Sequence, residues 1–215
     1  MARIVAAPKL SPLRIDLTQL AEGPALEPRE NYENQWFAGP IPLDVQGMTL
    51  NSCLIADASL DDVDFAASTF TECQFTGLDA PRLRLPRTVL RDCEIAESRF
   101  GAADLAEADL FSTRVRDCKF TWINCSGGTL RDVLFEDCVF DEIDLSQATA
   151  QRVAFCGCRT AALRLDGARL TDVDVRGLDI GGIGGLGSLR GAVLTHEQTL
   201  HLAPAFAAFL GATVD

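Results

Sequence analysis

The residues best suited to chemistry in this sequence are its eight cysteines, six of which recur at intervals of 20. These six are Cys53, Cys73 and Cys93, followed by Cys118, Cys138 and Cys158. Regularly spaced thiolates could bind a metal, but tetrahedral zinc needs four ligands that converge on one point. If one turn of the chain takes 20 residues, each trio forms a straight inward column that does not converge. We therefore predict small buried thiols and no metal site, with Cys156 alone reactive toward thiol reagents.

Acidic residues follow the same interval and form two columns beside the cysteines. The first column holds Asp57, Glu97, Asp117 and Asp137. The second holds Glu72, Asp92, Asp132 and Asp172, interrupted by Ser112 and Arg152. Carboxylates spaced along a regular surface form no cleft, so they predict a charged partner-binding face rather than a catalytic pair. The alternative interpretation is an ordinary solvated surface.

Two further features could indicate an enzyme, and neither has the context that an enzyme needs. His196 and His201 are five residues apart, which is the wrong spacing for one helix face. The segment 182–187 matches the glycine pattern of a dinucleotide site, but no following helix and acidic residue complete that motif. The sequence therefore predicts a protein without catalytic residues or a cofactor.

The columns depend on a five-residue repeat that runs from Leu43 to Ile180. Every fifth position from Val45 onward is large and apolar, except at Ala80, Cys125, Ala150 and Thr160. The position two residues earlier is also apolar or small, so inward residues fall at alternating steps of two and three. This spacing fits neither an amphipathic helix nor a simple strand. It fits a square coil of four five-residue units, stacked about seven times into one continuous core.

The repeat resembles a known family. Units such as 103–107 (ADLAE), 108–112 (ADLFS) and 138–142 (CVFDE) are similar to the A(D/N)LXX motif of the pentapeptide repeat proteins. The resemblance covers residues 43–180 and implies an all-β solenoid, a right-handed quadrilateral β-helix. Some members bind bacterial DNA gyrase or topoisomerase IV as mimics of duplex DNA and protect them from quinolones or peptide toxins. The loops that project from some quinolone-resistance members are missing here, because nothing interrupts the repeat.

Net charge limits the choice of partner. The chain carries a formal charge of −12, which disfavours direct binding to nucleic acid or an anionic membrane and favours a basic protein surface. The rod's net charge per unit length is roughly half that of duplex DNA, which has one charge per 1.7 Å. No apolar run approaches a membrane span and no signal-peptide core is present. A cytoplasmic location is therefore expected.

The segments outside the repeat are expected to close its ends. Residues 1–42 are interpreted as an N-terminal capping segment, with Trp36 and Phe37 covering the first coil; a flexible arm is the alternative. The β-helix is assigned to 43–194, with a slip of one residue in phase after the glycine-rich segment. Residues 195–215 form a helical element that begins with a capping box of Thr195 and Gln198 and is bent or split by Pro204.

Apolar side chains offer two further candidate contact sets. The terminal helix carries a stripe that either caps the last coil or forms a homodimer: Leu200, Leu202, Phe206, Phe209 and Leu210. Phe111 and Trp122 are predicted to face outward as candidate anchors for a partner. Together these features favour a non-enzymatic, DNA-mimicking modulator of DNA gyrase or topoisomerase IV. The competing hypothesis is an interaction scaffold with another protein partner.

Overall fold

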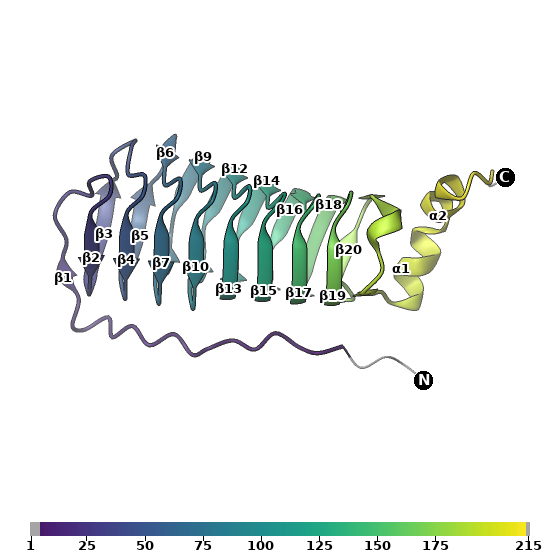
Figure 1. Cartoon of the computed structure of the whole chain (residues 1–215), viewed down its shortest axis with the longest axis horizontal. Helices are drawn as coiled ribbons and strands as arrows, with labels where there is room; N and C mark the ends of the chain where they lie inside the picture. Colours follow the sequence, from purple (N-terminus) through teal and green to yellow (C-terminus); the bar gives the residue numbers. More distant parts are fainter. Residues whose placement is uncertain (1–4, 214–215) are drawn as a thin grey trace.

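The protein is a straight rod of stacked coils with two short helices at one end (Figure 1). A computed structural model describes residues 5–213. The rod has about eight turns, and the 22 strands within the described residues belong to one hydrogen-bonded network. The fold is thus the β-solenoid with a helical cap that the five-residue repeat predicts, with about one turn more than the seven expected.

The strands are short because each one spans a single wall of the coil or two walls and the corner between them. The first eleven are β1 (Ala21–Glu22), β2 (Asn31–Glu33), β3 (Gln35–Pro40), β4 (Thr49–Asn51), β5 (Leu54–Ser59), β6 (Val63–Asp64), β7 (Thr69–Thr71), β8 (Gln74–Thr76), β9 (Asp79–Arg84), β10 (Val89–Arg91) and β11 (Glu94–Ala96). The others are β12 (Arg99–Asp104), β13 (Asp109–Arg116), β14 (Lys119–Asn124), β15 (Thr129–Glu136), β16 (Val139–Asp144), β17 (Thr149–Cys156), β18 (Cys158–Arg164), β19 (Arg169–Asp174), β20 (Leu178–Ile180), β21 (Ile183–Gly184) and β22 (Ala192–Val193). The helical elements are η1 (Leu186–Ser188), α1 (His196–His201) and α2 (Ala203–Phe209).

Residues 20 apart in the sequence lie directly over one another in the rod. Ile95 pairs in parallel with Phe75 on one side and with Val115 on the other. The same register stacks the rings of Phe100, Phe120 and Phe140, with centroid separations of 4.8 and 5.2 Å. Stacked aromatic rings bury much apolar surface and add favourable ring–ring contacts. The 20-residue coil predicted from the sequence is confirmed.

The corners of the coil explain the positions of many acidic residues. Two residues after a central apolar residue, the backbone turns through a positive φ, which is 48° at Asp57, 54° at Asp117 and 58° at Asp132. Most side chains disfavour this left-handed conformation, whereas glycine, asparagine and aspartate tolerate it best. Aspartate at a corner is therefore favoured by backbone geometry alone, whatever the surface binds.

The solenoid begins earlier than the repeat in the sequence. Strand β2 pairs with β4, and β3 pairs with β5, so that Tyr32 lies beside Leu50 and Phe37 beside Ile55. These partners are 18 residues apart rather than 20, and the register shifts further between Phe37 and Gly39. Residues 31–42 thus belong to a shorter first coil and are not a separate cap. The five-residue count does not include this coil because its spacing differs.

Residues 21–30 close the end of the first coil. Leu26 is only 2% exposed and packs into the core cluster. The Tyr32 hydroxyl accepts a hydrogen bond from the Glu27 N–H at 2.8 Å and donates one to the Ala25 carbonyl at 3.3 Å. Phe37, which was expected to cover the first coil, is instead buried in its wall, and Trp36 beside it is half-buried. The covering apolar side chain is Leu26.

Residues 5–20 turn back and run along the outside of the rod toward its other end (Figure 1). We call this extended segment the N-terminal arm. The arm is not a dangling tail, because it hydrogen-bonds to side chains of coils more than 100 residues away in sequence. It lies beside one of the two acidic columns.

The C-terminal end follows the sequence-based expectation closely. Ala192 pairs with Val173 at an interval of 19, so the phase does slip by one residue. Thr195 and Gln198 form the capping box of α1, and the helical segment is split, with Pro204 in the first turn of α2. The Gln198 amide also donates to the carbonyls of Val175 and Leu178, at 2.6 and 2.7 Å. These two hydrogen bonds tie the cap to backbone carbonyls of the last regular coil.

Candidate protein-binding surface

The first acidic column is exposed, and we call it the open corner: Asp57, Glu97, Asp117 and Asp137. All four are exposed and have left-handed backbones. Glycine occupies the intervening level at 77 and the level after Asp137, at 157. A Cβ built at Gly77 would lie 2.5 Å from an Asp57 carboxylate oxygen, so glycine there leaves room for the carboxylate of the preceding coil. The open corner thus displays carboxylates along one edge of the rod.

Arg116 neutralises part of the open corner. Its guanidinium lies 3.2 Å from Glu97 and 3.0 Å from Asp117, and its Nε lies 3.2 Å from Glu94. The hydrogen bond to Asp117 is the main cause that raises the pKa of Arg116, so this charge is permanent. Within the described residues, Asp57 and Asp137 make no ion pair. The unpaired negative charge of this corner is therefore concentrated toward its two ends.

The second acidic column, which we call the closed corner, is partly buried. It comprises Glu72, Asp92, Ser112, Asp132, Arg152 and Asp172. The Asp132 side chain is only 3% exposed, and both its oxygens accept hydrogen bonds at 2.6 Å from Arg152 of the next coil. It also accepts the backbone N–H of Lys9 at 2.8 Å. These donors, Arg152 first, hold the pKa of Asp132 below its ordinary value.

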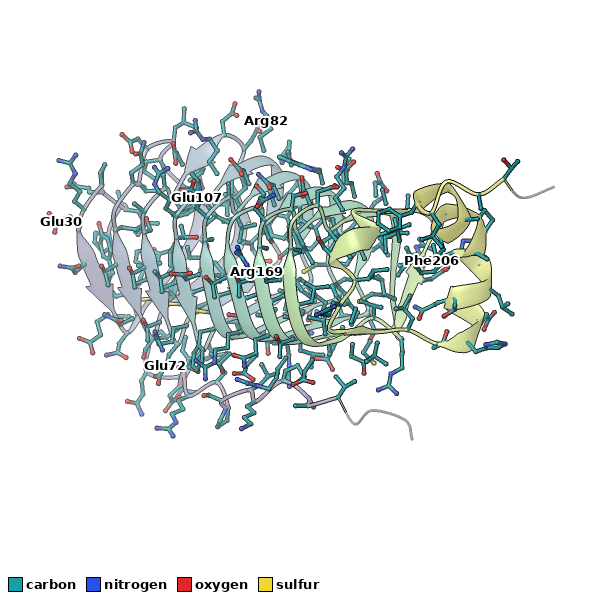
Figure 2. All side chains as sticks on the ribbon, turned by 45° about the vertical axis from the view of Figure 1, so that its right-hand side comes forward. Glu30, Glu72, Arg82, Glu107, Arg169 and Phe206 are labelled. Atoms are coloured by element: carbon teal, nitrogen blue, oxygen red, sulfur yellow. The ribbon has the colours of Figure 1, made fainter. Side chains whose placement is uncertain are left out.

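The N-terminal arm also covers the closed corner at Ser112, in the coil that precedes Asp132. The Ser11 N–H donates to the Ser112 hydroxyl at 2.8 Å, and Ser112 is 3% exposed. Residues 10–13 of the arm line a shared groove with Asp92 and Arg114. Glu72 lies further along the same side of the rod (Figure 2). The sequence predicted that both acidic columns face outward, which is wrong for Asp132 because the arm and Arg152 bury it.

Sequence reasoning also missed a third series of acidic residues with a structural role. Asp44, Asp64, Asp104 and Asp144 each lie directly before a central apolar residue, at positions that differ by multiples of 20. The Oδ1 of each accepts the backbone N–H two residues later, at distances from 2.8 to 3.2 Å. This contact is an Asx-turn, which shapes the corner that follows. The signal in the sequence was the recurrence of aspartate at this position of the coil, and the role of these side chains is structural.

The two candidate aromatic anchors differ in their surroundings. Phe111 is half-buried, and its ring lies between the guanidinium groups of Arg91 and Arg131, at 5.0 and 5.7 Å from the centroid. Phe111 is therefore already engaged in cation–π contacts. Trp122 is half-buried between its ladder partners Ala102 and Glu142.

The cysteine columns are structural, as expected. Seven of the eight cysteines are buried and all are free. The Cys73 thiol, for example, lies 3.3 Å from the Thr71 carbonyl, which it can cap at the corner. Burial raises the pKa of Cys125 to about 12, and a hydrogen bond with Cys118 raises that of Cys138 to about 12. Cys156 is the exposed thiol, so its selective reactivity stays a prediction.

The described residues form no metal site. No group of three or more His, Cys, Asp or Glu residues in the described part of the chain is placed to hold a metal ion. An apolar space of about 40 Å³ lies inside the core, and a hollow of about 560 Å³ lies between the last regular coil and α1. Among residues 5–213, no helix is both long and apolar enough to cross a bilayer.

The regular register and the turn-forming aspartates define a β-solenoid built on a five-residue repeat. The chain has the repeat and the fold of a pentapeptide repeat protein. No protein-family model matches the sequence, and no curated protein sequence matches it. Solved structures of the same fold do match.

One matching structure is a trypsin-treated variant of QnrB1, described as a plasmid-mediated fluoroquinolone resistance protein. It is 15% identical, with a TM-score of 0.39, over 84% of this chain and 99% of that one. Another is HetL of the cyanobacterium Nostoc sp. strain PCC 7120, a pentapeptide repeat protein involved in regulating heterocyst differentiation. It is 14% identical, with a TM-score of 0.39, over 77% and 90% of the two chains. Likeness at this level concerns the fold and carries no functional argument.

Proposed function

We propose that this pentapeptide repeat protein is a non-enzymatic rod that binds a basic protein surface through its open corner. The observation that carries the proposal is the exposure of Asp57, Glu97, Asp117 and Asp137 along one edge. Strands of neighbouring coils are about 4.8 Å apart, so these carboxylates form a linear array. A linear array of fixed negative charge attracts cationic grooves and steers their approach.

We further propose that the basic partner is DNA gyrase or topoisomerase IV, and that the rod mimics duplex DNA. Two observations support this partner: the repeat's resemblance to a family with such members, and the net charge of −12. These enzymes bind duplex DNA, so a rod-shaped acidic surface fits the same kind of groove. Such a partner also implies a cytoplasmic location, as the sequence predicts.

A supercoiling assay tests this partner directly. Purified gyrase is assayed on relaxed plasmid with micromolar rod protein, with and without a fluoroquinolone. Reduced supercoiling, or supercoiling retained in the presence of the drug, is the expected result. The control is the variant Glu97→Gln/Asp117→Asn/Asp137→Asn, hereafter the open-corner variant, which should lose most of the effect. If wild-type protein leaves supercoiling and drug sensitivity unchanged, the gyrase proposal is wrong.

An interaction scaffold with a different protein partner is the second candidate. The observation that favours it is the structural reason for the acidic corners: their left-handed backbones select aspartate even without a partner. A pulldown with wild-type protein as bait would support the scaffold if it returned a stable partner other than a topoisomerase, and if the open-corner variant lost that partner.

We also propose that the rod forms a homodimer through its terminal helices. Leu202 is buried and Phe206 packs against the core (Figure 2), whereas Leu200, Phe209 and Leu210 are 63%, 60% and 78% exposed. The helical segment thus caps the last coil with one face and leaves an apolar face open. Light scattering should give a dimer mass for wild type and a monomer mass for Phe209→Asp/Leu210→Asp. A monomer mass for the wild-type protein would contradict the proposed homodimer.

A further inference from the structure

The N-terminal arm occupies the closed corner in the manner of a bound peptide. It is extended, and successive contacts are two residues apart: Lys9 donates its N–H to Asp132, and Ser11 donates its N–H to Ser112. The side-chain acceptors are 20 residues apart, so the arm advances two residues for each coil. An extended chain presents every second N–H to the same side, which matches this spacing.

The pattern is incomplete at the next coil. Two residues beyond Ser11, Leu13 lies in the groove lined by Asp92, Ser112 and Arg114. One oxygen of Asp92 is buried there without a hydrogen-bond partner. A buried carboxylate oxygen without a donor is unfavourable. The arm therefore fits the groove at two levels and leaves an acceptor unused at the third.

We propose that the closed corner is a docking groove for an extended cationic segment of a protein partner, and that the N-terminal arm is a displaceable occupant of this groove. The inference builds on the proposed function, because it assigns a second surface to the same basic partner. The chemistry that fits is a backbone N–H at alternate residues and a cationic side chain opposite Asp92 and Glu72. The arm itself carries Lys9 and Arg14 against a single acid, Asp16, within residues 5–20.

The arm is suited to release. Within residues 9–17, its backbone is not paired into the sheet, and Leu17 is 53% exposed. Segments with few buried apolar contacts open at low cost relative to the core. A partner that binds the groove must displace the arm, so the arm lowers the partner's apparent affinity by the fraction of time the groove is filled.

The test removes the two N–H donors without touching the rod. Lys9→Pro/Ser11→Pro deletes both donors while suiting an extended backbone, and Lys9→Ala/Ser11→Ala is the matched control that keeps them. In the full-length proline variant, trypsin should cut after Arg14 about tenfold faster than in the control, as loss of two hydrogen bonds predicts. A fluorescent nona-arginine peptide should also bind about fivefold tighter in low salt, because the groove is open.

Two further variants locate the peptide. Adding Glu72→Gln/Asp92→Asn to the proline variant should abolish the gain in affinity, whereas adding Asp117→Asn/Asp137→Asn removes the same charge from the open corner and should preserve the gain. Equal cleavage rates in the proline and alanine variants, or equal peptide affinities, would overturn the inference. Gyrase inhibition by wild type, without tighter peptide binding by the proline variant, would contradict the docking groove and leave the gyrase proposal standing. Tighter peptide binding without any effect on gyrase would contradict only the proposal that gyrase is the partner.

Discussion

The open and closed corners are built from the same kind of residue and differ in what surrounds them. Asp137 and Asp132 both have left-handed backbones, with φ of 50° and 58°. Asp137 is exposed, whereas Asp132 is held by Arg152 and the N-terminal arm and is 3% exposed. One carboxylate is available to a partner, and the other contributes to the cohesion of the rod.

This difference shows that charge counted in the sequence is not charge displayed on the surface. A 20-residue register places acids in columns, but only tertiary contacts decide whether a column faces water. Arg116 reduces the charge of the open corner, and Arg152 neutralises the centre of the closed one. Of the two acidic columns, only the open corner displays all of its carboxylates at the surface.

The largest expected difference between the corners is in stability. Asp132→Asn should lower the free energy of unfolding by about 2–3 kcal/mol, because it weakens a nearly buried, bidentate ion pair. Asp137→Asn should change it by less than about 0.5 kcal/mol, since asparagine also tolerates the left-handed corner. Urea unfolding monitored by circular dichroism measures both. Equal losses would mean that the two corners do not differ.

Acid should remove the stability that Asp132 contributes. Its pKa is lowered in the folded state, so the contribution is complete above the unfolded value of about 3.9 and is lost as pH falls through the lower folded value. The difference in free energy of unfolding between wild type and Asp132→Asn should therefore be constant from pH 7 to pH 5 and should decrease below pH 4. Urea unfolding of both proteins across this pH range measures that difference. A difference that increased in acid would contradict the prediction.

A smaller effect is expected on partner binding. The open-corner variant should bind gyrase about tenfold more weakly than wild type, since three exposed charge contacts are worth roughly 0.5 kcal/mol each. Biolayer interferometry at two salt concentrations measures this change, and wild-type binding should weaken more steeply with salt.

The matched control removes the same net charge elsewhere. Asp44→Asn/Asp64→Asn/Asp104→Asn retains each turn-forming side-chain oxygen and should weaken binding by less than about threefold, through the general field alone. If both triple variants weaken binding equally, the partner senses overall charge and the open corner is not a specific surface.

Much of the fold could be predicted from the sequence because a solenoid converts local spacing into three-dimensional position. The register of Phe75, Ile95 and Val115 follows from counting. The first coil could not be predicted, because its 18-residue spacing breaks the count. The buried state of Asp132 could not be predicted either, because it depends on Lys9, which is 123 residues away and outside the repeat. No periodicity links the arm to the corner.

Carboxylate labelling compares the two corners most directly. Native protein is treated with a water-soluble carbodiimide and glycine ethyl ester, and modification at each residue is measured by peptide mass spectrometry. We expect rapid labelling of Asp57 and Asp137 and protection of Asp132 until the protein is unfolded. Labelling of Asp132 in the native state as fast as that of Asp137 would show that neither corner is closed.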